Sequence, residues 1–334
     1  NSSAMKDFIG GVILFSNNYQ SISQLKNLLN EIKELKSNIL ISIDHEGGRV
    51  QRFRKDFTNL PSFYQLANAV ECDREKLSYY SGIIAGYELS QIGIDLNYSP
   101  VIDICENENN SLLSKRTFGN DESVIISLSS NYINGLMDSG VMPVMKHYPG
   151  HGLVNSDSHI EECVSDETEQ SDKFCKHFSI FKELTQLYDI PIMTSHIRFK
   201  NIDEHIVTYS KKILNLINKN NRTFFISDDL EMHSAKIKNS IQITPSERIR
   251  LALDAGCSFL IVTTMLLDEI RIHNKTSEYL IENYLTDKVR NICKEIRLDK
   301  IPYSDFKYSN KQKKKPEELN NIYFEAKKNL SGII

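Results

Sequence analysis

Short runs of apolar, often β-branched residues recur along most of the chain, and several are separated by segments with helical spacing of apolar positions. Residues 21–36 place Leu25 and Leu29 on one face and predict an amphipathic helix. A second helix is expected over about 123–139, ended by Gly140. The apolar runs that have the length and composition of buried parallel strands are residues 10–15, 39–44, 94–104, 141–147, 190–196, 223–229 and 257–262.

The alternation of strands and helices predicts an α/β fold. No stretch rich in proline or glycine divides the chain, and no Gly-x-Gly-x-x-Gly turn follows any strand. One closed, TIM-like (β/α)8 barrel is therefore favoured over an open doubly wound sheet, although only seven strands are recognised. Residues 1–334 are expected to form a single catalytic barrel domain, with no second domain.

Composition and charge narrow the class of protein. The 334 residues are 40% hydrophobic and carry a net charge of −4, which argues against a protein that binds nucleic acid or a membrane surface. No apolar run approaches the length of a membrane span. The six cysteines show no paired spacing, as is typical of reduced thiols in a cytosol. We therefore expect a cytoplasmic protein.

Polar residues gather at the carboxyl ends of the predicted strands. In a parallel barrel these ends form the face that carries catalytic groups. A single aspartate at a strand end is most often a cap or a turn residue, but five such ends together indicate an active site. The residues concerned are Asp44, Asp103, Lys146, His147, His196, Asp228 and Asp229.

The stretch 145–159, "MKHYPGHGLVNSDSH", contains the densest group of ionisable residues. Asp157 and His159 are two positions apart, so an extended backbone puts both side chains on one side and lets the carboxylate hydrogen-bond the imidazole. An imidazole held in this way has a fixed tautomer and suits a general acid/base. Gly150 and Gly152 suggest that the loop swings over bound substrate.

Two other interpretations of this loop stay open. The four residues His147, His151, Asp157 and His159 could bind zinc, but their separations match no common short zinc spacing, so no metal is expected. Alternatively, the loop could be a glycine-rich surface segment whose histidines bond only the backbone. Composition does not decide between these interpretations.

Several motifs together resemble glycoside hydrolase family 3, and in particular its bacterial NagZ-type β-N-acetylglucosaminidases. The resemblance runs in order over about residues 9–262 and implies a TIM-like barrel whose missing strand would be the first, before residue 10. The motifs are "IDHEGGRVQRF" (43–53), "NYSPVIDI" (97–104), "RTFG" (116–119), "KHYPGHGLVNSDSH" (146–159), "ISDDLEM" (226–232) and "ALDAGCSFLIV" (252–262).

The resemblance also implies a role for individual residues. Asp228 matches the catalytic nucleophile, His159 the general acid/base and Asp157 the residue that orients His159. Residues that match those holding the sugar hydroxyls and acetamido group are Asp44, Arg52, Arg116, Lys146 and His147. A two-step retaining mechanism without metal or organic cofactor is implied. His196 could line the sugar site or pack beneath it.

The implied substrate is a small molecule from peptidoglycan recycling, N-acetylglucosamine linked β-1,4 to anhydro-N-acetylmuramic acid, with or without its peptide. The enzyme is expected to act as a monomer. Two alternatives remain: a family 3 β-glycosidase of another sugar specificity, and a sugar-binding barrel without catalytic activity. Arg116, Lys146 and His147 argue against the first, and the intact Asp157, His159 and Asp228 set argues against the second.

Three positions near these motifs need separate interpretations. His45 stands where the family usually has glutamine, and we expect its ring to keep a hydrogen bond. Glu231 stands where a small residue is frequent, so it either faces solvent at the rim or raises the pKa of nearby acids. Asp229 is expected to bond the backbone where the strand turns into the next helix.

Overall fold

The computed structural model describes residues 10–69, 73–106, 112–217, 223–238, 241–263 and 314–331. Each of the seven predicted strands is present within these ranges, mostly over a shorter span than its apolar run. The run at 141–147 forms two short strands instead of one. The strands are β1 (Gly11–Leu14), β2 (Leu40–Ile43), β5 (Leu96–Asn97), β6 (Met142–Pro143), β7 (Met145–Tyr148), β9 (Ile192–Thr194), β11 (Phe225–Asp229) and β14 (Cys257–Ile261).

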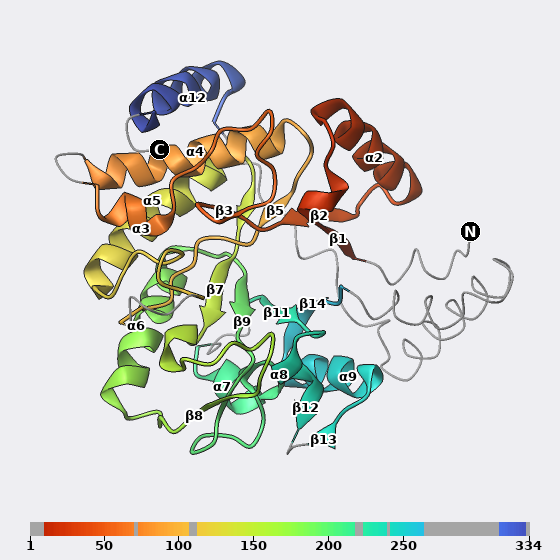
Figure 1. The fold of residues 1–334 in the computed structure, drawn as a ribbon, viewed down its shortest axis with the longest axis vertical. Coiled ribbons are helices and arrows are strands. Elements are labelled where there is room, and N and C mark those ends of the chain that lie inside the picture. Colours follow the sequence, from red (N-terminus) through yellow and green to blue (C-terminus); the bar gives the residue numbers. More distant parts are fainter. Residues whose placement is uncertain are drawn as a thin grey trace, which may run out of the picture.

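These strands form two parallel four-stranded sheets, with the orders β1-β2-β5-β6 and β14-β11-β9-β7. Only Val144 separates β6 from β7, so residues 142–148 contribute to both sheets. The strands thereby form one series that follows the order of the sequence and passes through β7 near the middle of the molecule (Figure 1). A parallel series in sequence order requires helical crossovers, as the alternating pattern predicted.

The α/β architecture with parallel sheets is confirmed, whereas the closed barrel is not. No pairing between β14 and β1 is present in the described part of the chain, so these two strands do not close a ring. The first strand implied by the family resemblance would precede residue 10 and lies outside the described residues.

The helices begin and end at recognisable signals. In α2, Ser21 accepts a hydrogen bond from the backbone N–H of Gln24 at 3.2 Å. Gly140 follows α5 with φ 81°, which confirms its predicted place after the helix. The α-helices are α2 (Ile22–Leu35), α3 (Phe63–Ala67), α4 (Arg74–Ser90), α5 (Glu122–Asp138), α6 (Asp172–Leu187), α7 (Lys211–Asn215), α8 (His233–Lys236), α9 (Pro245–Ala255) and α12 (Pro316–Leu330).

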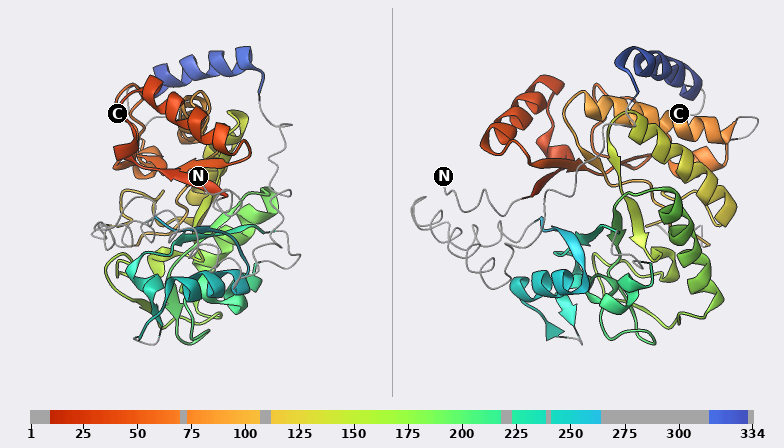
Figure 2. Two further views of the ribbon diagram at one scale, coloured as in Figure 1. Left: turned by 90° about the vertical axis from the view of Figure 1, so that its right-hand side faces the viewer. Right: turned by 180° about the vertical axis from the view of Figure 1, so that it is seen from behind.

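The last described helix, α12, packs against α4 at one end of the molecule (Figures 1 and 2). Tyr87 of α4 stacks on Tyr323 of α12 with ring centroids 4.3 Å apart, and its hydroxyl donates to Asn320 at 3.1 Å. These contacts fix α12 on the side of α4, although the two segments are more than 200 residues apart in sequence. None of the helices within the described ranges is long and apolar enough to cross a membrane.

Short strand pairs and 3₁₀ turns occupy the connections that follow the main strands. The hairpin of β3 (His45–Gly47) and β4 (Val50–Gln51) follows β2. Residues 149–162, which we call the dyad loop, connect β7 to β8 (Cys163–Ser165), and β8 pairs with β10 (Ile197–Phe199). The remaining short elements are β12 (Ile237–Lys238), β13 (Ile241–Gln242), η1 (Ser16–Asn18), η2 (His151–Leu153) and η3 (Val207–Tyr209).

Candidate active site

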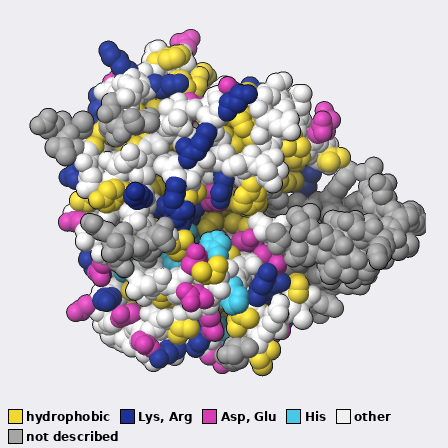
Figure 3. Space-filling model, in the orientation of Figure 1, with side chains coloured by type: hydrophobic (Ala, Val, Ile, Leu, Met, Phe, Trp, Pro, Cys, Tyr) yellow, Lys and Arg dark blue, Asp and Glu magenta, His cyan; other side chains and the backbone are white. Residues whose placement is uncertain are grey.

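A cavity of about 290 Å³ lies at the carboxyl ends of the strands and collects most of the predicted site residues. Figure 3 shows a hollow that contains histidine, with Lys and Arg side chains on one rim and Asp and Glu on the other. Of the predicted set, Asp157 and His196 are not among the residues that line the cavity. The predicted residues that do line it are Asp44, Arg52, Arg116, Lys146, His147, His159 and Asp228.

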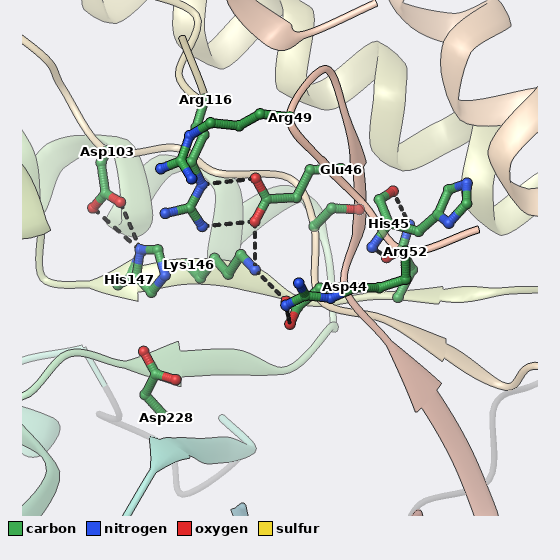
Figure 4. Close-up of polar contacts among 12 residues, drawn as sticks. Asp44, His45, Glu46, Arg49, Arg52, Asp103, Arg116, Lys146, His147 and Asp228 are labelled. Carbon is green, nitrogen blue, oxygen red and sulfur yellow. Dashed lines mark hydrogen bonds and ion pairs between the residues drawn. The ribbon is translucent and has the colours of Figure 1, made fainter. Parts of the chain in front are cut away.

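One wall carries a network of salt bridges, the charged cluster, formed by Asp44, Glu46, Arg52, Arg116 and Lys146. The Lys146 ammonium lies 2.7 Å from Asp44 Oδ1 and 2.8 Å from Glu46 Oε1. Arg52 Nη2 donates to Asp44 Oδ2 at 2.9 Å. Arg116 holds Glu46 at both carboxylate oxygens, with Nε and Nη2 at 2.9 and 2.7 Å (Figure 4). Such a two-point pair fixes the plane of the guanidinium.

The cations of this cluster keep its carboxylates ionised. Burial raises the pKa of the Asp44 carboxyl, but Lys146 and Arg52 outweigh it and hold that pKa well below its usual range. Burial also raises the pKa of the Glu46 carboxyl, but Arg116 and Lys146 outweigh this effect and lower the pKa below normal. The pKa of Lys146 is raised because Asp44 and Glu46 outweigh the opposing effect of burial. The cluster is therefore a fixed set of charges near neutral pH.

A second buried pair joins Asp103 to His147. The ring Nδ1 of His147 lies 2.7 Å from Asp103 Oδ2, and the backbone N–H of His147 donates to Asp103 Oδ1 at 3.2 Å. Burial raises the pKa of Asp103, but His147 outweighs it, and the resulting pKa is about 2. A carboxylate bound to one ring nitrogen orients the imidazole and leaves its other nitrogen for the cavity.

Asp228, the predicted nucleophile, lies on β11 opposite the charged cluster (Figure 4). Its carboxylate accepts a hydrogen bond from the backbone N–H of Asp229 at 2.8 Å. Burial raises its pKa, but the nearby His147 and His196 outweigh this effect and leave the pKa below normal. Asp228 is therefore an ionised carboxylate that faces the cavity, as a nucleophile must be.

The predicted pairing of Asp157 with His159 is present in the dyad loop. His159 Nδ1 lies 2.8 Å from Asp157 Oδ1, and the same oxygen accepts from the His159 backbone N–H at 2.9 Å. The side chains of His159 and Asp157 are 62% and 37% exposed, so this pair is far more open to solvent than the charged cluster. Burial raises the pKa of Asp157, but the bonds from His159 leave it below normal.

His196 packs beneath the cavity and does not line it. Its Nε2 lies 3.0 Å from the backbone oxygen of Asp229, which can only accept, so Nε2 is the donor. Its Nδ1 lies 2.8 Å from the Thr208 hydroxyl. Both ring nitrogens are therefore used within the protein, and the side chain supports the backbone directly after Asp228.

The expectation for His45 was wrong, and one of the two alternatives for Glu231 is excluded. The ring of His45 is fully buried near Phe53 and Phe57, and neither ring nitrogen has a hydrogen-bond partner within the described ranges. Burial among rings removes the partners that a more open site would offer. Glu231 does not face solvent, since it pairs with Arg248 at 2.9 Å and its side chain is only 7% exposed.

The prediction that Asp229 bonds the backbone at the end of its strand is confirmed. Its carboxylate accepts from the backbone N–H of Glu231 at 3.0 Å and of Thr263 at 3.3 Å, and from the Thr263 hydroxyl. These contacts tie the end of β11 to the segment after β14. Asp229 thus stabilises the turn that presents Asp228.

Sequence reasoning missed Glu46 and gave Asp103 no role. Glu46 follows Asp44 by two positions at the end of a predicted strand, and this spacing was an available signal for two carboxylates that approach one cation. For Asp103, the strand-end position was noticed, but its partner lies 44 residues away. The histidines do not assemble into a metal site: no group of three or more His, Cys, Asp or Glu residues able to hold an ion was found among the residues described.

A family comparison covers most of the chain. The model described as "Glycosyl hydrolase family 3 N terminal domain" matches residues 2–294. A β-hexosaminidase of Hydrogenovibrio crunogenus is 34% identical over 261 residues, which is 76% of this chain and 71% of that protein. A β-hexosaminidase of Psychromonas ingrahamii is 32% identical over 290 residues, with 83% of each protein covered.

Solved structures give the same relationship. Native NagZ from Neisseria gonorrhoeae matches with a TM-score of 0.76 at 26% identity, covering 99% of this chain and 92% of that one. NagZ from the same organism in complex with N-trifluoroacetyl-D-glucosamine matches with a TM-score of 0.70 at 29% identity, covering 85% and 84%.

Proposed function

The chain belongs to glycosyl hydrolase family 3 as an enzyme of the β-hexosaminidase type, and from this premise we propose that it is an exo-acting β-N-acetylglucosaminidase with a two-step retaining mechanism. One observation carries the proposal. The ionised Asp228, the exposed His159 and four members of the charged cluster line one cavity, the four being Asp44, Arg52, Arg116 and Lys146. A retaining glycosidase needs a nucleophile, a proton carrier and fixed sugar contacts in this arrangement.

In the first step the Asp228 carboxylate attacks the anomeric carbon and displaces the leaving oxygen, which takes a proton from His159. The products are a covalent glycosyl-enzyme and the freed alcohol. In the second step water attacks the same carbon, gives its proton to His159 and releases Asp228. Asp157 holds the imidazole through Nδ1 and stabilises its protonated form, leaving Nε2 to exchange the proton.

The charged cluster and His147 hold the sugar. Each cation of the charged cluster is already bound to a carboxylate, so its hydrogen-bond donors are oriented before the substrate arrives. A cavity of about 290 Å³ is small for a ligand site, where about 300–1,000 Å³ is usual, and suits a single sugar ring. This size supports removal of one terminal N-acetylglucosamine at a time.

The natural substrate proposed here is N-acetylglucosamine linked to anhydro-N-acetylmuramic acid, with or without peptide, in cell-wall recycling in the cytoplasm. The parallel series formed by the seven predicted runs supports a TIM-like barrel whose remaining strand would lie between β14 and β1. We further propose that the catalytic site belongs to a single domain spanning residues 1–334 and acting as a monomer. No metal or organic cofactor enters this mechanism.

The test is hydrolysis of 4-nitrophenyl N-acetyl-β-D-glucosaminide against the matching β-glucoside, with the anomer released first identified by NMR. We expect faster release from the N-acetylglucosaminide and β-N-acetylglucosamine as the first product. Faster glucoside hydrolysis would favour the other sugar specificity. Sugar binding without hydrolysis would favour the inactive barrel, and an α-anomer as first product would exclude the retaining mechanism.

A further inference from the structure

Ser158 lies between the two dyad residues and, unlike them, is buried at the edge of the cavity, which it lines together with His151 and His159. The side chains of Asp157 and His159 are 37% and 62% exposed, whereas Ser158 is 1% exposed. Residues 158–160 form a turn, in which the backbone N–H groups of Ile160 and Glu161 both donate to the Asp157 carbonyl oxygen at 3.0 Å. This turn leaves the Asp157–His159 pair open to solvent and buries the Ser158 side chain between them.

The Ser158 hydroxyl forms a hydrogen bond with the buried histidine His151. Ser158 Oγ lies 3.1 Å from His151 Nε2, and His151 is 3% exposed. Burial, followed by the nearby His147, lowers the pKa of His151 to about 4, so this ring is neutral near pH 7. A neutral imidazole and a hydroxyl can form this bond with either tautomer, because a hydroxyl both donates and accepts.

His151 is itself fixed at the root of the dyad loop. Its backbone N–H donates to Asp103 Oδ1 at 2.6 Å, and Asp103 also holds His147. The flanking glycines fit tightly: a Cβ on Gly152 would lie 1.8 Å from the Ile104 carbonyl oxygen, and one on Gly150 would lie 2.2 Å from His177 Nδ1. These glycines permit close packing at the root, which explains them without requiring a hinge there.

Ser158 is also tied to the segment that follows the nucleophile. Its carbonyl oxygen accepts a hydrogen bond from the backbone N–H of Ser234 at 3.0 Å. Ser234 lies in α8, which follows β11, and its hydroxyl donates to the His196 carbonyl oxygen at 2.5 Å. One residue of the dyad loop thus contacts both the loop root and the region that carries Asp228.

We propose that Ser158 is a positioning residue for the proton transfer: its hydroxyl, held by His151, fixes His159 over the glycosidic oxygen of a sugar bound at Asp228. The inference rests on the proposed function. Because a displacement of about 1 Å costs about 100-fold in a positioned reaction, loss of this bond reduces the step that depends on His159. Attack by Asp228 is slowed only where the leaving oxygen needs that proton, so substrates with good leaving groups are little affected.

The experiment compares Ser158→Ala with Ser156→Ala on aryl N-acetylglucosaminides that range from good to poor leaving groups. Ser156 lies in the same loop, and within the described part of the chain only its backbone oxygen takes part in a hydrogen bond, accepting from Cys163 Sγ. Ser158→Ala should lose about 10- to 100-fold in kcat/KM with poor leaving groups and less than about 3-fold with good ones. Ser156→Ala should keep the wild-type dependence.

The ratio between substrates is independent of how much protein is folded, so partial unfolding of Ser158→Ala does not obscure the result. Ser158→Thr keeps the hydroxyl and should restore the wild-type ratio. Adding Ser158→Ala to His159→Ala should cause no further change in that ratio, because Ser158 acts through His159. An equal loss on all leaving groups, or additive effects in the double variant, would overturn the inference. A wild-type enzyme without N-acetylglucosaminidase activity would instead overturn the proposed function.

Discussion

Asp44 and Asp157 are both carboxylates paired with a basic side chain in one site, yet their surroundings differ. Asp44 binds Lys146 and Arg52 inside the charged cluster, where Lys146 is only 3% exposed. Asp157 binds one imidazole at the surface of a loop, with 37% of its side chain exposed. The charged cluster suits groups that must not move or titrate. The exposed Asp157–His159 pair suits a group that must exchange protons with solvent.

Asp228→Ala removes the proposed nucleophile opposite the charged cluster and should have the largest effect. We expect kcat to fall by about 10⁴-fold or more, because the variant cannot form the glycosyl-enzyme. Binding of N-acetylglucosamine, measured by calorimetry, should stay close to wild type, since the charged cluster is intact. Near-normal turnover would exclude Asp228 as the nucleophile.

Glu46→Gln, in the charged cluster, should lower the stability of the protein more than a substitution in the exposed Asp157–His159 pair. Removing one partner of a buried ion pair costs about 3–5 kcal/mol, because Arg116 and Lys146 lose a carboxylate they cannot replace with water. The thermal midpoint should fall, and sugar affinity should weaken. The matched control is Asp157→Asn, where an exposed pair contributes at most about 1 kcal/mol. Equal stability of the two variants would contradict the contrast between the regions.

His159→Ala should affect catalysis selectively. With poor leaving groups we expect a loss of about 10²- to 10⁴-fold, while nitrophenolate should still depart without a proton. The second step then lacks its base, so the covalent glycosyl-enzyme should accumulate as a burst and as a mass increase of one N-acetylhexosamine. Asp157→Ala should show a weaker form of this pattern. Equal losses on all substrates, with no intermediate, would assign the proton to another residue.

Acid should destabilise the protein through His45, a buried residue next to Asp44 of the charged cluster. Burial, followed by Arg54 and Arg52, lowers the pKa of His45 from 6.5 to about 3. The folded state then binds fewer protons than the unfolded state below pH 6.5, so stability is lost as the pH falls from 6.5 towards 3. Between pH 7.5 and 5.0 the loss is about 2 kcal/mol.

His45→Gln removes this titration and should flatten the fall in thermal midpoint between pH 7.5 and 5.0. Two other buried histidines, His151 and His177, have pKa values lowered to about 4 and keep part of the acid sensitivity. Parallel pH curves for the wild type and the variant would show that His45 does not titrate in this way.

Prolonged chelation should have the smallest effect, with activity unchanged. Asp228 and His159 already supply the nucleophile and the proton carrier, so the proposed chemistry assigns no step to an ion. Activity lost on chelation and restored by zinc would revive the interpretation of His147, His151, Asp157 and His159 as a metal site.

Features encoded over short distances were predictable from the sequence. The seven predicted strands follow from local apolar runs. The Asp157–His159 contact was predicted from an extended backbone, but it forms in a turn, where the backbone N–H groups of Ile160 and Glu161 donate to the Asp157 carbonyl oxygen. The roles given to Asp228 and to the sugar-binding residues came from motifs that resemble a family, and the placement of most of them around one cavity agrees with that resemblance. Barrel closure was not predictable to the same degree, because it depends on pairing between distant strands.

Only the tertiary structure decided which charges meet and which side chains find no partner. Lys146 meets Asp44 across 102 residues and Arg116 meets Glu46 across 70, and no local pattern specifies such pairs. The same holds for His45, whose ring nitrogens could bond in an open site but lie among Phe53 and Phe57. Side-chain chemistry is local, whereas burial and electrostatic partners arise when distant segments pack together, so residue types set what is possible and packing selects what occurs.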